Sequence, residues 1–135
     1  METQSNGATE KSCRDADLTN SIIGCAIEVH KTLGPGLLES VYESCLMHEL
    51  VRAGCLVERQ KKLLVNYKGL EFEEGFRIDL LVNDTVIVEL KCVERLLPIH
   101  EAQLYTYLKL SGKRTGLLIN FLSKLLKDGI QRIAC

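Results

Sequence analysis

No apolar run in this chain of 135 residues approaches the length of a membrane span, because charged residues interrupt every segment within about 20 residues. The N-terminus lacks a basic stretch followed by an apolar one, so no secretory signal is expected. The six cysteines are scattered without a Cys-x-x-Cys pair, which argues against zinc and iron–sulfur sites. A Gly-rich phosphate loop, a Ser/His/Asp order and a nucleophile elbow are absent as well. These absences predict a cytoplasmic protein in a reducing compartment, with no membrane contact.

The charge of the chain is small but unevenly distributed. A net charge of −1 gives no electrostatic case for nucleic acid by itself. Between Lys109 and Cys135, however, six lysines or arginines stand against the single acid Asp128. A second basic run is Arg59-Gln60-Lys61-Lys62. Both runs fit a phosphate-facing stripe, and they fit equally well solvated faces that flank a central strand.

The chain is predicted to be a single α/β (α+β) domain at residues 18–135, preceded by a flexible tail at residues 1–17. The tail is polar and aperiodic, whereas the overall hydrophobic content of 46% suffices for a core. Asp17 or Thr19 is expected to cap a first helix that ends at Gly34. Periodicity and turn signals predict helices at 37–53, 98–110 and 122–127, and strands at 56–59, 63–67, 70–74, 76–82, 86–91, 114–121 and 130–134.

The segment with the most chemical information is a predicted β-hairpin. Two apolar, β-branched-rich runs at residues 76–82 and 86–91 flank an Asn-Asp-Thr break. If the whole break forms the loop, Asp79 lies directly opposite Glu89 on the neighbouring strand. A strict two-residue turn would set Asp79 against Val88 instead. The geometry of the site therefore depends on the length of this loop.

Facing carboxylates at this position favour a metal ion. Two carboxylates across a ladder repel each other, and burying them unpaired costs several kcal/mol. A divalent cation removes that cost, and carboxylate oxygens are the ligands that Mg²⁺ prefers. Asp79 and Glu89 are therefore candidate metal ligands. The alternative is a pair of solvated charges at the strand edge, with Lys91 neutralising Glu89.

Two helices carry further candidate residues. His100, Gln103 and Tyr107 recur at i, i+3 and i+7 on the helix that follows Lys91, so they share one side. This polar stripe either orients a substrate or is a hydrated helix face. Glu39, near the start of the second helix, is either a third carboxylate at the same centre or an acid favoured there by the helix dipole. The core positions of the third helix are predicted to be Ile99, Ala102, Leu104 and Leu108.

Several long motifs resemble one family. Residues 36–42, Gly-Leu-Leu-Glu-Ser-Val-Tyr, match the signature G-x-x-E-x-x-Y. Their surroundings at residues 27–30 and 33–35, and the segments 86–91, 97–104 and 116–121, are also similar to that family. The resemblance to the GxxExxY protein family covers about residues 18–133. This family is placed in the PD-(D/E)XK nuclease-like superfamily. The resemblance implies a restriction-endonuclease-like domain whose αβββαβ core, a mixed central sheet flanked by helices, carries an acidic, metal-dependent phosphodiesterase site.

The resemblance also implies roles for individual residues. Asp79 resembles the metal-binding Asp of the superfamily, and Glu89 and Lys91 resemble its E-x-K half. Glu39 resembles the acid on the preceding helix. The Q-x-x-x-Y helix motif of the exonuclease-like branch is matched by Gln103 and Tyr107. The usual Pro before the Asp is replaced by Ile78.

These residues lead to two hypotheses. The first is a nuclease dependent on Mg²⁺ or Mn²⁺ that hydrolyses phosphodiester bonds in DNA, with the Leu90 carbonyl as a further metal ligand. A domain this small would bind mainly through phosphates, and a homodimer would widen the contact surface. The second is a non-catalytic nucleic-acid- or protein-binding accessory domain that retains the nuclease fold. Near-neutral charge and small size favour the second hypothesis, whereas the intact set of acidic residues and Lys91 opposes it.

Overall fold

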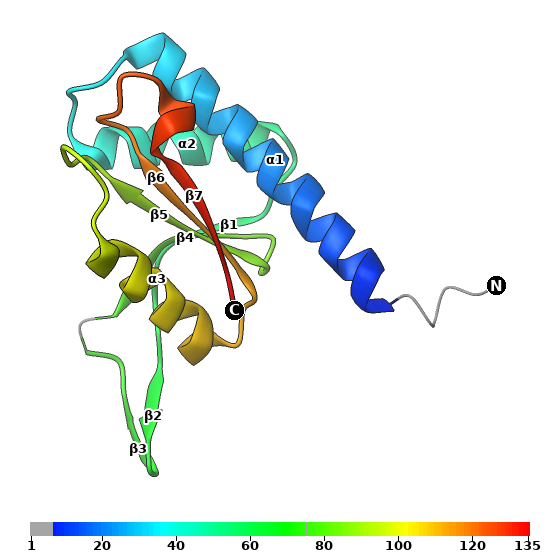
Figure 1. Cartoon of the computed structure of the whole chain (residues 1–135). Helices are drawn as coiled ribbons and strands as arrows, with labels where there is room; N and C mark the ends of the chain where they lie inside the picture. Colours follow the sequence, from blue (N-terminus) through cyan, green and yellow to red (C-terminus); the bar gives the residue numbers. More distant parts are fainter. Residues whose placement is uncertain (1–6, 75) are drawn as a thin grey trace.

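A mixed five-stranded sheet with the strand order β1-β4-β5-β6-β7 organises the chain (Figure 1). Strands β5 and β6 are parallel, and the other neighbouring pairs are antiparallel. The computed structural model describes residues 7–74 and 76–135, with side chains from residue 15 onward within those ranges. The predicted mixed α/β fold is confirmed. The strands of the sheet are β1 (Val57–Lys62), β4 (Arg77–Val82), β5 (Val86–Lys91), β6 (Thr115–Asn120) and β7 (Ile130–Ala134).

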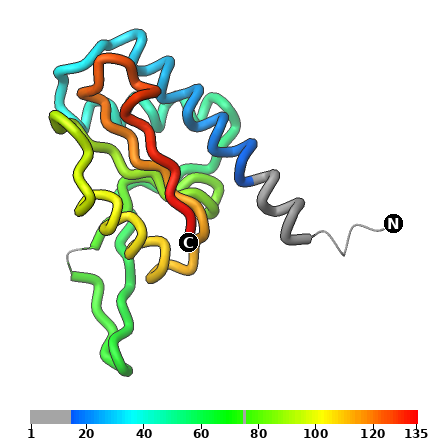
Figure 2. Tube along the Cα trace, in the orientation of Figure 1, coloured from blue at the N-terminus to red at the C-terminus, as the bar shows by residue number. Residues whose placement is uncertain are grey.

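Helices cover both faces of this sheet (Figures 1 and 2). α1 (Gly7–Leu33) and α2 (Glu39–Arg52) pack on one face, and α3 (Pro98–Ser111) packs on the other. α3 forms the crossover between β5 and β6, because parallel neighbours cannot be joined by a tight turn. None of the helices in the described part of the chain combines the length and the apolar character needed to cross a bilayer.

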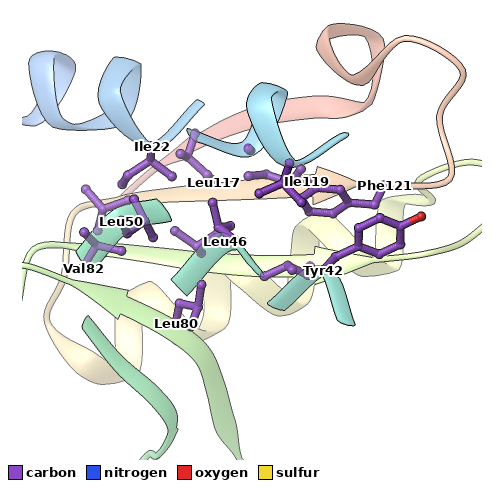
Figure 3. Packing of buried hydrophobic residues seen from close by; sticks show 14 of the residues in the cluster. Ile22, Tyr42, Leu46, Leu50, Leu80, Val82, Leu117, Ile119 and Phe121 are labelled. Carbon is purple, nitrogen blue, oxygen red and sulfur yellow. The ribbon is translucent and has the colours of Figure 1, made fainter. Parts of the chain in front are cut away.

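The larger core lies between the sheet and the helices α1 and α2 (Figure 3). Tyr42 of α2 is fully buried, and its ring stacks on Phe121 with centroids 4.7 Å apart and an interplanar angle of 14°. Its hydroxyl donates to the Gly34 carbonyl at 2.5 Å and accepts from the Leu37 N–H at 3.0 Å. The connection between α1 and α2 is thereby fixed to the core, which sets the start of α2. The other residues labelled in this core are Ile22, Leu46, Leu50, Leu80, Val82, Leu117 and Ile119.

A smaller core forms under α3. Leu104, Tyr107 and Leu108 are buried at i, i+3 and i+4 against the opposite face of the sheet. The sequence pattern places Tyr107 on the polar side of this helix, whereas the structure has it in the buried stripe. Ile99 and Ala102, predicted to face the core, are exposed because they fall off that stripe.

The strands β2 (Val65–Tyr67) and β3 (Leu70–Phe72) form a separate hairpin that projects from the main sheet (Figure 1). Lys68 and Gly69 form its turn with φ values of 50° and 92°. Positive φ at both central residues matches the twist of the flanking strands. The sequence predicted both strands and the turn, and the structure adds that the hairpin leaves the sheet between β1 and β4.

Two predicted boundaries are wrong. α1 begins at Gly7, so Asp17 and Thr19 lie inside the helix and neither is its cap. The Thr19 hydroxyl donates instead to the Ala16 carbonyl at 2.9 Å, a back-bond that a helical threonine can form. The predicted short helix at residues 122–127 is a turn followed by the 3₁₀ helix η2 (Leu126–Gly129).

The division of the chain into a tail and a domain at residue 17 stays a prediction. Residues 1–6 of the expected tail lie outside the described residues, and residues 7–17 belong to α1. Asp15 already contacts the sheet, because its carboxylate accepts a hydrogen bond from the Thr115 hydroxyl at 3.1 Å.

Candidate active site

The β4–β5 hairpin has the register that brings Asp79 next to Glu89. Its paired residues are Leu80–Val88, Leu81–Ile87 and Val82–Val86. The loop therefore has three residues, of which Asn83 and Asp84 have φ values of 52° and 53°. Asn and Asp tolerate this left-handed conformation better than most residues with a side chain. The predicted register is confirmed, and the two-residue turn that would pair Asp79 with Val88 is excluded.

Each of the two carboxylates binds the backbone of the neighbouring strand. Glu89 Oε1 accepts a hydrogen bond from the Asp79 N–H at 3.0 Å. Asp79 Oδ2 accepts one from the Leu90 N–H at 2.9 Å. These bonds lie just beyond Leu80–Val88, the last paired position of the ladder. Glu89 is only 5% exposed and Asp79 is half-buried. The hairpin thus holds two acidic side chains together in a poorly solvated position.

Burial and proximity raise the pKa of both acids. Burial is the main cause of the raised pKa of Glu89, which reaches about 8, and the charge of Asp79 adds to it. Burial also raises the pKa of Asp79, and the hydrogen bond from Leu90 opposes the rise. If both acids were ionised, the pair would carry more negative charge than its surroundings stabilise, and either a proton or a cation relieves this.

Lys91 and Glu39 border the pair. The ammonium of Lys91 opposes the burial-driven rise in the pKa of Asp79, Glu89 and Glu39, so it lies within electrostatic range of all three carboxyls. The pKa of Glu39 is raised first by partial burial and then by Asp79. Because Glu39 is the first residue of α2, the N-terminal end of that helix approaches the acidic pair.

α3 brings one of its two predicted site residues close to the acids. Tyr107 is 5% exposed, and its pKa is raised first by burial and then by Glu89 and Asp79. Its ring meets Phe76 edge-on, with centroids 6.4 Å apart at 87°. Gln103, one turn earlier on α3, is exposed, and among the described residues it makes no hydrogen bond to the acidic pair.

Sequence reasoning missed the side chains that hold Asp79 from the other side. Glu43 of α2 is 4% exposed and accepts from Arg59 Nε at 2.5 Å and from Gln60 Nε2 at 2.9 Å. The same Gln60 nitrogen donates to Asp79 Oδ1 at 3.3 Å. The sequence held one indication that Glu43 belongs to the site, since Glu43 follows Glu39 by one helical turn and lies on the same side of the helix. In the sequence, Arg59 and Gln60 stand out only as parts of a basic run.

Part of that basic run is neutralised within the chain. Arg59 and Lys61 both form ion pairs with glutamates. In the second basic segment, Lys113 pairs with an aspartate of the β4–β5 loop. Lys62 stands directly opposite Arg77 in the β1–β4 register, and both residues are exposed. Like charges that face each other across a ladder repel. Lys62, together with Arg77 on the neighbouring strand, is therefore the part of this surface best suited to receive an anion.

The chemistry of the donor set fits a divalent cation. Asp79 and Glu89 supply two oxygen ligands of the kind that Mg²⁺ and Mn²⁺ prefer. Burial is the main cause of their raised pKa values, and a divalent ion would stabilise their ionised forms. Within the described ranges, no group of three or more His, Cys, Asp or Glu side chains is arranged to hold a metal. An ion here would thus rest on two carboxylates and on backbone or water oxygens.

The comparisons with known proteins agree with this fold. The sequence model of the PD-(D/E)XK nuclease superfamily matches residues 16–133, which is most of the chain. The chain therefore belongs to the PD-(D/E)XK nuclease superfamily. Nucleases of this superfamily generally use divalent metal ions, and membership points to a nuclease that binds nucleic acid. Searches among curated proteins and among solved structures give no significant match.

Proposed function

We propose that the protein is a nuclease that uses Mg²⁺ or Mn²⁺ to hydrolyse phosphodiester bonds in DNA. The observation that carries the proposal is the pair of half-buried Asp79 and buried Glu89, whose charges repel each other, with Lys91 two residues after Glu89 on β5. A fold without catalysis gains nothing from two acids that destabilise each other. Membership of the nuclease superfamily supports the same conclusion.

Four residues form the centre of the proposed site. Asp79 and Glu89 would hold the ion, with the Leu90 carbonyl as a further oxygen ligand. When bound, a divalent ion neutralises the phosphate and lowers the pKa of the attacking water. Lys91 donates hydrogen bonds to that water or to the phosphoryl oxygens, where negative charge develops during the reaction.

The helices supply the remaining groups. Glu39 orients a water molecule or a second ion from the start of α2. Tyr107 donates a hydrogen bond to the scissile strand, since its phenol is protonated at neutral pH and burial raises its pKa further. Gln103 contacts the same strand from the exposed turn that precedes Tyr107.

Substrate binding in this proposal depends on phosphates. Lys62 and Arg77 lie on β1 and β4, and Arg77 is two residues before Asp79, so a bound strand that reaches the acids passes this pair. Binding through phosphates weakens steeply with salt. Each substitution that removes a lysine or arginine in contact with a phosphate should reduce the slope of log affinity against log salt concentration by about one. A homodimer would double the phosphate-binding surface.

The signature at residues 36–42 supports membership of the GxxExxY family, and the scattered thiols support a cytoplasmic location.

One observation favours a second function, a non-catalytic nucleic-acid- or protein-binding accessory domain. The acids already bind backbone N–H groups, and the described residues offer no trio of metal ligands. A domain of this kind would keep the fold without binding an ion at this position.

Titration of Mn²⁺ by calorimetry into wild type and Asp79→Asn separates the two functions. The amide introduced by this substitution still offers an oxygen to the Leu90 N–H, so the fold is retained. We expect wild type to bind Mn²⁺ and to cleave labelled DNA, and Asp79→Asn to do neither. Labelled RNA in the same assay tests the choice of substrate. Absence of Asp79-dependent binding would contradict the nuclease proposal and favour the accessory domain, and binding without cleavage of either nucleic acid would contradict the proposed catalysis.

A further inference from the structure

We propose that Gln60 positions the carboxylate of Asp79 for metal binding, and that buried Glu43 orients Gln60 for this task. The inference rests on the proposed function, because it concerns the same site. It assigns a role to a residue that neither the motifs nor the family resemblance singles out.

The backbone of Gln60 is the first part of the argument. Its neighbours Arg59 and Lys61 pair with Leu80 and Ile78, so Gln60 stands opposite Asp79 in the β1–β4 ladder. Gln60 has a φ of 53°, which interrupts the ladder at this residue. A left-handed conformation is unfavourable for a residue with a side chain. An interaction of the side chain must offset this cost.

The amide group of Gln60 supplies that interaction. Its nitrogen lies 2.9 Å from Glu43 Oε1 and 3.3 Å from Asp79 Oδ1. Carboxylates only accept hydrogen bonds, so the NH₂ end of the amide must face both, with one hydrogen for each. The second oxygen of Asp79 is held by the Leu90 N–H at 2.9 Å. Both oxygens of Asp79 are therefore fixed before an ion arrives.

Glu43 gives the arrangement its rigidity. It is buried on α2, and the partly exposed Arg59 guanidinium pairs with it at 2.5 Å, so its charge is paired within the protein. A buried, charge-paired acceptor holds the Gln60 amide more firmly than water would. The chain of contacts thus runs from α2 through β1 to the metal-binding side of β4. Partners of this kind, which orient a ligand without touching the ion, commonly change metal affinity about 10- to 100-fold.

The test measures the affinity of the full chain for Mn²⁺ by calorimetry, together with thermal melts. Gln60→Met keeps the length of the side chain but cannot donate, whereas Gln60→Gly removes the amide and relieves the positive φ. We expect both variants to bind Mn²⁺ at least about 10-fold more weakly than wild type, although their stabilities differ. Gln131→Met, on β7, is the matched control and should bind as wild type does.

A double-variant cycle tests the role of Glu43. Glu43→Gln alone should weaken Mn²⁺ binding, and it should add little in the Gln60→Met background, because both changes act on Asp79 through one path. If Glu43→Gln lowers the Mn²⁺ affinity of Gln60→Met by as much as it lowers that of wild type, Glu43 acts on the ion independently of Gln60, and the inference is overturned. Gln60 variants that melt lower but bind Mn²⁺ like wild type would also overturn it. If wild type shows no binding that Asp79→Asn abolishes, the proposed function fails, and this inference fails with it.

Discussion

Glu89 accepts a hydrogen bond from the backbone N–H of Asp79, the residue whose charge helps to raise its pKa. The two effects act on the same carboxyl in opposite directions. Burial decides the balance, and the pKa of Glu89 rises to about 8. At neutral pH and without an ion, this side chain is therefore mostly protonated. The proposed site exchanges a proton for a cation.

The first prediction follows from this exchange. Binding of Mn²⁺ at pH 7 should release close to one proton, because the ion requires the ionised form of Glu89. Calorimetric titrations in buffers with different ionisation enthalpies measure the number released. The release should shrink at pH 9 and disappear in Glu89→Gln. Metal binding at pH 7 without proton release would show that Glu89 is already ionised or is not a ligand.

The second prediction concerns stability without metal. The free energy of unfolding should fall as pH rises from about 5 to 8, because Glu89 has a pKa of about 8 in the native state and about 4.5 in the unfolded chain. In this window the native state keeps a proton that the unfolded chain has released, so rising pH favours unfolding. Each unit between the two pKa values corresponds to about 1.4 kcal/mol.

Urea unfolding at several pH values checks this trend. Glu89→Gln retains an oxygen that can accept from the Asp79 N–H but has no proton to lose. Its stability should therefore depend less on pH, and above pH 8 it should exceed that of wild type. A wild type whose stability rises across this window would contradict the prediction.

The third prediction separates chemistry from packing at Tyr107. Its ring packs edge-on against Phe76, and Tyr107→Phe keeps that ring. The free energy of unfolding should change by no more than about 1 kcal/mol. Cleavage of DNA should fall by about 10- to 100-fold, because the variant loses a hydrogen-bond donor beside the acids. Tyr105→Phe, on the exposed face of α3, is the control and should retain full activity. Equal cleavage activity in Tyr107→Phe and Tyr105→Phe would show that the Tyr107 hydroxyl has no role in catalysis.

The fourth prediction concerns the tyrosine of the G-x-x-E-x-x-Y signature. The Tyr42 hydroxyl bonds Gly34 and Leu37, so Tyr42→Phe leaves two backbone groups of the α1–α2 connection without this partner. The free energy of unfolding should fall by about 1–3 kcal/mol. Chemical denaturation measures the loss, again against Tyr105→Phe. A variant as stable as wild type would mean that water replaces the hydroxyl without cost.

The acidic hairpin could be predicted from the sequence because its determinants are local. Alternation along the two strands and a three-residue loop fix the positions of Asp79 and Glu89. The apolar periodicity of residues 37–53 likewise placed Glu39 near the start of a helix, where the structure has it. Short-range rules were sufficient for the helix, whereas they left two loop lengths open for the hairpin, between which the structure decides.

The remaining parts of the site depend on contacts between distant segments. The left-handed φ of Gln60 has no signature, since no neighbouring residue requires it. The periodicity of the sequence assigned Tyr107 to a polar stripe of α3. In the structure its side chain is buried in the smaller core between α3 and the sheet. His100 of the same stripe uses Nδ1 to accept the Leu97 N–H at 3.0 Å and thereby helps to start α3. Among the basic residues that fit a phosphate stripe, Arg59 and Lys113 are paired with acids 16 and 29 residues away, whereas the partner of Lys61 is only three residues away.

The short connection between β4 and β5 has a kinetic consequence. Because one hairpin supplies both acids, Asp79 and Glu89 meet as soon as its strands pair, whereas α2 and α3 must dock from more distant parts of the chain. Their repulsion therefore opposes an early, local step on the folding pathway. A divalent ion should act mainly on the refolding rate and much less on the unfolding rate. Stopped-flow refolding with Mn²⁺ and with a chelator measures this difference, and an ion that changes only the unfolding rate would place the meeting of the acids late in folding.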